Sequence, residues 1–158
     1  MKKPKINPEA IHLLKVSVFK SLIERQEAFL DQPFIEPKNY SFSFAQKTTF
    51  NHEEKRVRIQ LFILLKARGN NASNLGIQGE FGIEFNYKVD NLDNLCTKED
   101  DGKRHYDASL GTTLMSISYS TARGIILQQT QGSIISLSGV IMPVINPADL
   151  LKAPVESK

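Results

Sequence analysis

Apolar and polar side chains alternate with a period of two in three segments of the chain. They are residues 40–45, 57–66 and 74–89. Successive side chains of a β-strand point to opposite faces, so this alternation predicts strands with one packed and one solvated face. Turn-forming residues separate the segments, as adjacent antiparallel hairpins require. Gly79 and Gly82, inside the last segment, indicate a bulge or a strong bend there.

An earlier apolar segment, residues 13–24, is rich in β-branched side chains. This composition favours a strand, although periodicity alone leaves a helix open. Residues 31–39 contain Pro33 and Pro37, neither of which can donate a hydrogen bond to a strand ladder, and are expected to form a connector.

The carboxyl-terminal half carries a different pattern. Residues 90–107 are polar and charged and predict a long exposed excursion. Apolar spacings over 109–129 predict a helix, and its many small residues would allow another element to approach closely. Gly132 suits the end of this helical region. Asn146 suits the N-cap of a second, short helix, with Pro147 at its first position.

Strands first and helices last define the α+β class. We expect a four-stranded antiparallel sheet with one long and one short C-terminal helix on one face. The 158 residues are enough for a single domain over 1–158, with an ordered core at about 11–152 and flexible ends.

Charge is nearly absent from the C-terminal third. Between Ala108 and Ala148, the one formally charged residue is Arg123. A solvated amphipathic helix keeps a charged outer face, whereas a helix that is neutral all round is buried or shared with a partner. The long helix is therefore expected to lie between the sheet and another subunit.

The composition is globular, with 41% apolar and 23% charged residues. Neither a secretory signal nor an apolar run long enough for membrane insertion is recognised, and the lone Cys96 has no intrachain partner for a disulfide. These features predict a cytoplasmic protein. The net charge is +3, but the cations are scattered along the chain, so a nucleic-acid partner is not expected.

Candidate chemistry is sparse. His12, His52 and His105 are far apart in the sequence and none has metal-ligand spacing. Cys96 and its acidic neighbours belong to a polar loop without a converging scaffold. No phosphate loop or nucleophile motif is present. We expect no catalytic, cofactor-binding or metal-binding residues, no cofactor and no enzymatic activity.

Three stretches resemble the SecB family of export chaperones. Residues 119–126, Tyr-Ser-Thr-Ala-Arg-Gly-Ile-Ile, are similar to the family's helix with its aromatic-x-x-Ala-Arg core. Residues 143–151, Pro-Val-Ile-Asn-Pro-Ala-Asp-Leu-Leu, are similar to its closing stretch, and residues 78–83 match its glycine-containing strand in pattern. The resemblance covers roughly residues 13–152.

The resemblance implies a sheet backed by two helices and assembly as a homotetramer, a dimer of dimers. It also implies a chaperone without ATP that holds unfolded polypeptides in apolar grooves. Some members pass clients to the SecA motor, whereas others serve toxin–antitoxin systems. SecB proteins that work with SecA are typically acidic on the open sheet face. Here Glu80 and Glu84 would share that face with Arg58 and Lys88, which leaves SecA open as a partner.

The candidate residues follow from the aromatic face of segment 40–45 and from the matched motifs. Thr121 stands where the family often has a groove aromatic. The client-groove candidates are Tyr40, Phe42, Phe44, Phe81, Tyr119, Thr121, Leu150 and Leu151. The oligomer-interface candidates are Leu114, Ile117, Ser118, Ala122, Arg123 and Ile125. Arg123 is expected to pair with a carboxylate or to cap carbonyls, because an isolated charge in an interface needs a partner.

Three functions follow from these observations. The leading hypothesis is an ATP-independent holdase for non-native or pre-export polypeptides, which would bind through apolar contacts and extended backbone pairing. The alternative is a dedicated adaptor, such as a SecB-like chaperone that recognises one antitoxin. A closed pocket with converging polar groups would instead favour a ligand-binding α+β domain.

Overall fold

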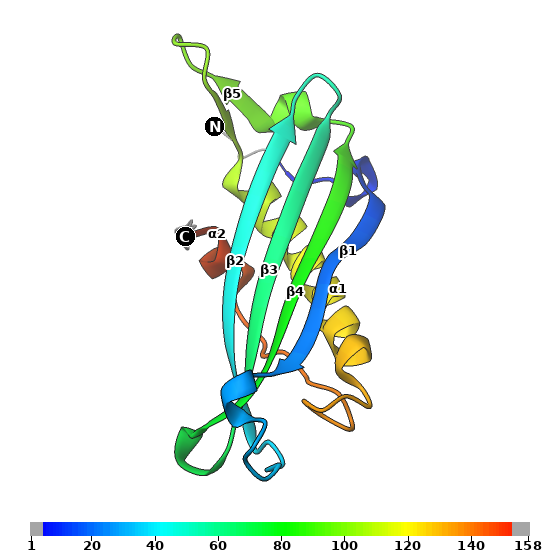
Figure 1. The fold of residues 1–158 in the computed structure, drawn as a ribbon. Helices are drawn as coiled ribbons and strands as arrows, with labels where there is room; N and C mark the ends of the chain where they lie inside the picture. Colours follow the sequence, from blue (N-terminus) through cyan, green and yellow to red (C-terminus); the bar gives the residue numbers. More distant parts are fainter. Residues whose placement is uncertain (1–4, 153–158) are drawn as a thin grey trace.

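The structure, a computed structural model, describes residues 5–152 as a twisted sheet with a long helix across one face (Figure 1). The four long strands are β1 (Ile11–Arg25), β2 (Asn39–Asn51), β3 (Arg56–Arg68) and β4 (Asn74–Val89). They are antiparallel in the order β1-β4-β3-β2, so β1 and β2 form the two edges. The helices are α1 (Ala108–Thr130) and α2 (Pro147–Lys152). The predicted α+β class is confirmed, and residues 13–24 form a strand.

Shorter elements occupy the connections. They are the 3-10 turns η1 (Pro8–Ala10), η2 (Glu27–Phe29), η3 (Asn70–Ala72) and η4 (Leu92–Leu95), and the hairpin strands β5 (Cys96–Lys98) and β6 (Arg104–Tyr106). Residues 31–38 contain no regular element, as the two prolines predicted.

The core lies between the sheet and α1. Every second residue of β3, such as Ile59 and Leu61, is buried, whereas the intervening Arg58 is exposed. Opposite them, α1 buries Leu114 and Ala122. Burial of a large aliphatic side chain contributes about 1.5–3 kcal/mol, so this layer supplies most of the stabilisation that the sequence pattern predicted.

Both helix starts are capped as the residue types favour. The Asp107 side chain accepts a hydrogen bond from the Ser109 amide (2.8 Å), and the Asn146 side chain accepts one from the Ala148 amide (3.1 Å). Beyond the end of α1, Gly132 has φ +69°, in the left-handed region that glycine adopts without strain. The predicted helix limits, 109–129, are confirmed to within one residue at each end.

The bulge predicted in the glycine-containing strand lies instead in its neighbour. The register of β1 against β4 shifts between Val18 and Lys20, which makes Phe19 the extra residue. A Cβ on Gly82 would lie 2.3 Å from the Phe19 ring. The glycine therefore makes room for an aromatic ring across the strand pair, and the prediction assigned the irregularity to the wrong strand.

The excursion predicted for residues 90–107 is only partly exposed. Leu92 and Leu95 of η4 are buried, although the β5–β6 hairpin that follows projects from the body of the fold. Residues three apart lie on one side of a 3-10 turn, so these two leucines reach the core together. The many charged neighbours hid this short apolar pair.

Candidate functional site

The connector between the helices, residues 131–146, is tied to its neighbours by side-chain hydrogen bonds. Tyr40 on β2 donates to the Ile135 carbonyl (2.7 Å), and Tyr119 on α1 donates to the Pro143 carbonyl (2.5 Å). The Arg123 Nε donates to the Met142 carbonyl (3.1 Å), so Arg123 caps a carbonyl within its own chain. Burial raises the pKa of the Tyr119 hydroxyl above its usual 10.0, which keeps it protonated as a donor.

This connector divides its apolar side chains between the core and the surface. Ile135, Val140 and Met142 are buried. The exposed fractions of the others are 47% for Ile134, 87% for Leu137, 71% for Ile141 and 84% for Val144. Neighbouring exposed apolar side chains on a soluble domain mark interaction sites. Here the buried set and the hydrogen bonds fix the segment that presents the exposed set.

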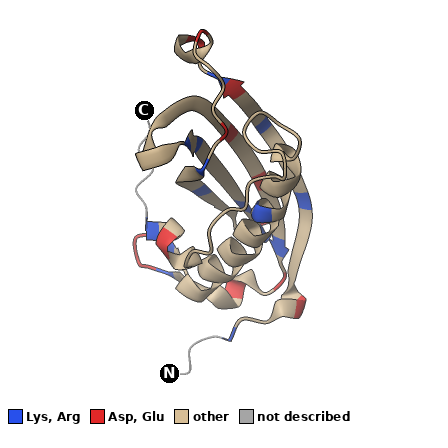
Figure 2. Cartoon of the chain, turned by 90° about the horizontal axis from the view of Figure 1, so that it is seen from below, with Lys and Arg blue, Asp and Glu red and all other residues tan. Residues whose placement is uncertain are grey.

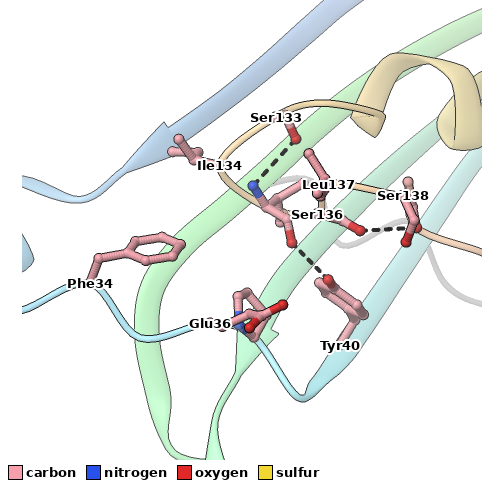
Figure 3. Close-up of a pocket in the computed structure, with 11 residues that line it drawn as sticks. Phe34, Glu36, Tyr40, Ser133, Ile134, Ser136, Leu137 and Ser138 are labelled. Carbon is pink, nitrogen blue, oxygen red and sulfur yellow. Dashed lines mark hydrogen bonds between the residues drawn. The ribbon is translucent and has the colours of Figure 1, made fainter.

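A groove of about 600 Å³ lies between this connector and the one that joins β1 to β2. Figure 3 shows Phe34 and Ile134 at one end and Ser138 at the other, with Tyr40 bonded to the connector. We call this the connector groove, and it is lined by Phe34, Glu36, Pro37, Tyr40 and the run from Ser133 to Gly139. It is a surface groove with mixed apolar and hydroxyl lining, and not the closed pocket that a small-molecule domain would show.

Beside the groove runs the outer edge of β2. Within the described part of the chain, β2 pairs only with β3, so its other edge carries backbone groups without a strand partner. Such an edge can accept an added strand, whose backbone supplies affinity while neighbouring pockets take its side chains. The groove and the edge together suit an extended polypeptide.

The structure brings four of the predicted groove residues together. Tyr40 lines the groove itself. Phe42 and Phe44 are stacked with ring centroids 6.0 Å apart, and Phe44 meets Tyr119 edge to face at 5.7 Å. Tyr40, Phe42 and Phe44 are partly buried against the core, and Tyr119 is buried. This aromatic row supports the connector from below.

The other groove candidates lie apart from it. Phe81 is 2% exposed and packs in the core under α1. Thr121 is half-buried, and its hydroxyl donates to the Ile117 carbonyl one turn earlier (2.9 Å). Leu150 is buried, while Leu151 is partly exposed on α2. Their role in a groove remains a prediction.

The interface candidates on α1 divide between its two faces. Leu114, Ser118 and Ala122 point at the sheet and are fully buried in the chain itself. Ile117 and Ile125 are partly buried. The outward positions, Ser116, Ser120 and Gly124, are exposed, small and uncharged. Assembly through α1 stays a prediction, and these three residues are the ones that a partner subunit would meet.

The sequence did not single out Phe34, Ile134 or Leu137 as site residues. The run 134–142 was recognised as apolar, but nothing in its pattern indicated which side chains the fold would bury. Its interleaved serines and Gly139 were a usable signal, because a core strand seldom carries so many.

Groups of three or more side chains suited to a metal do not occur among residues 5–152. No helix in the same range is both long and apolar enough to cross a membrane.

The sheet order and the single long helix define the α+β fold of the SecB-like chaperones. The *Mycobacterium tuberculosis* SecB-like chaperone Rv1957, solved with a ChAD peptide from the Rv1956 HigA1 antitoxin, superposes with a TM-score of 0.59. The match is 11% identical and covers 87% of this chain and 91% of that one. A *Streptococcus agalactiae* protein of unknown function gives a TM-score of 0.40 at 10% identity, over 85% and 97%. No protein-family model and no curated sequence matches the chain.

Proposed function

We propose that this protein is a non-catalytic, SecB-like chaperone that binds an extended polypeptide segment in the connector groove. The observation that carries the proposal is the set of exposed apolar side chains on a hydrogen-bonded connector, Leu137 above all. Burying such side chains against a partner is favourable, and because the connector is already ordered, little conformational entropy is lost on binding.

The free edge of β2 supports an extended rather than a helical ligand. A segment that pairs with this edge would run past Tyr40 and Phe34, which line the groove. Its alternate side chains would point toward the groove, since strand side chains alternate. Glu36 and the connector serines would contact polar positions of the same segment.

We favour one dedicated partner, such as an antitoxin, over the general set of pre-export proteins. The support is the structural neighbour, which was solved with an antitoxin peptide. A groove of this modest size is also better suited to one short segment than to long stretches of many clients. The general holdase, coupling to SecA, a homotetramer and a cytoplasmic location are wider possibilities that the same experiment addresses.

The test is capture of partners on the tagged full-length chain, with the Leu137→Ser variant as the matched control. One protein recovered in a fixed ratio, and lost in the variant, supports a dedicated partner. Many unfolded proteins lost in the variant support the general holdase. Equal recovery on both proteins, or none on either, overturns the proposed groove.

An aggregation assay complements the capture. A chemically unfolded test protein is diluted with and without the chaperone, and light scattering follows its aggregation. A delay that requires Leu137 supports holdase activity, whereas light scattering on the chaperone alone reports its oligomeric state.

A further inference from the structure

The sheet face opposite α1 carries a cluster of cations drawn from all four strands. We call it the basic half; it consists of Lys15 on β1, Lys47 on β2, Arg56 and Arg58 on β3, and Lys88 on β4. All five side chains are exposed. The register sets Arg56 against Lys88, and Asn86 lies between Arg58 and Lys15. Figure 2 marks lysines and arginines in blue on neighbouring strands of the sheet.

The cations of the basic half are incompletely neutralised by the chain itself. Among residues 5–152, Lys88 pairs with Asp90 (3.6 Å), but Lys15, Lys47, Arg56 and Arg58 make no ion pair.

The carboxylate on this part of the face is Glu84, and it is held by amides. It accepts hydrogen bonds from Asn86 (3.0 Å) and Gln60 (2.9 Å). These bonds, followed by the charges of Arg58 and Lys15, lower its pKa. The positive potential of the face is therefore available to an external anion.

The other half of the same face is apolar. Phe19 and Phe62 meet edge to face with centroids 5.7 Å apart, and both rings remain exposed, by 49% and 40%. Leu22 lies two residues further along β1 and is 42% exposed. A shallow hollow of about 240 Å³ adjoins Phe62 and Leu64. Lys20 and Glu80 line this hollow and pair with each other.

We propose that this face is a second docking surface, which binds an acidic polypeptide segment carrying both carboxylates and apolar side chains. Carboxylates would lie on the basic half, and apolar side chains would cover Phe19 and Phe62. A nucleic acid suits the face less well, since its phosphates would pass Glu84 and Glu80. The surface shares no lining residue with the connector groove, so the proposal stands apart from the proposed function.

The test measures fluorescence anisotropy of labelled probes on the full-length chain. The probes are a short peptide in which glutamate alternates with leucine, the same peptide with glutamine for glutamate, and a single-stranded oligonucleotide. We expect the acidic peptide to bind most tightly and to weaken as salt is raised. Equal binding of the glutamine peptide, or tighter binding of the oligonucleotide, overturns the proposal.

Charge reversal locates the site. Lys15→Glu with Arg58→Glu should weaken binding of the acidic peptide by about tenfold or more, because two attractions become repulsions. The control, Lys98→Glu with Lys103→Glu, changes the net charge equally at exposed positions of the distant hairpin and should leave binding unchanged. Equal losses in both variants would mean that only net charge matters, which overturns the proposal.

Two further measurements keep the result interpretable. Lys15→Gln with Arg58→Gln should give a smaller loss in the same direction, and a circular dichroism melt identifies a variant that fails to fold. Leu137→Ser should leave binding of the acidic peptide unchanged. If that variant removes it, the peptide occupies the connector groove and the second surface is wrong.

Discussion

Replacing Leu137 with serine should weaken partner binding without weakening the fold. The side chain is 87% exposed in the free protein, so its apolar surface contributes little to folding. Substitutions at such positions change the free energy of unfolding by no more than about 0.5 kcal/mol. Nearly all of the burial energy of a leucine is therefore available to a ligand.

The size of the effect follows from that exposure. Full burial of a leucine is worth about 1.5–3 kcal/mol, and we take about 1.5–2 kcal/mol for a side chain that is nearly fully exposed beforehand. This corresponds to an increase in Kd of roughly 10- to 30-fold. Titration calorimetry with a reduced and alkylated, permanently unfolded protein measures the change, and a urea unfolding curve checks stability.

Val144→Ser is the matched control. Val144 belongs to the same connector and is 84% exposed, yet it does not line the connector groove. Its replacement should change affinity by less than about threefold, on the scale of one rim contact. The reasoning fails if Leu137→Ser binds like the unaltered protein, or if both variants lose affinity equally.

Three more predictions concern the fold and its charges. Gly124→Ala should raise the melting temperature by about 2–4 °C, since alanine favours a helix by about 1 kcal/mol and the new Cβ meets no atom within 4 Å. Tyr87→Phe should cost about 1 kcal/mol in urea unfolding, because it removes the buried hydroxyl bonded to Ser118 (2.7 Å). Asp93→Asn should destabilise the protein at neutral pH, with the difference shrinking in acid. Lys55 and then His52 hold the pKa of Asp93 below its usual 3.8, so its contribution is lost as pH falls through that lowered value.

Each of these has an outcome that contradicts it. A lower melting temperature for Gly124→Ala would mean that another surface packs on the outer side of α1. An unchanged unfolding energy for Tyr87→Phe would mean that the hydroxyl gains nothing over water. A stability loss for Asp93→Asn that persists unchanged in strong acid would exclude the charge as its cause.

The strands and helices were largely readable from the sequence. Alternation over 57–66 placed the core side chains of β3 correctly, because burial of one sheet face imposes a period of two. Cap residues located the start of α2 at Pro147. Leu92 and Leu95 were missed since two apolar residues in a charged stretch make no period.

The candidate site was less accessible to sequence reasoning. Tyr40 was found because it begins an aromatic alternation. Leu137 and Phe34 were missed because they lie in connectors, where no repeating geometry links residue order to direction. Their exposure depends on how the two connectors pack against α1 and β2.

The sequence by itself determined the α+β class, the uncharged long helix and the absence of recognisable catalytic motifs, since each depends on local pattern or composition. Only the tertiary structure decided which side chains share a surface. Lys15, Lys47 and Lys88 are far apart along the chain, and their scatter suggested no charged face. Antiparallel pairing places them on one half of the open sheet. Register is a long-range property, so no local window of sequence contains it.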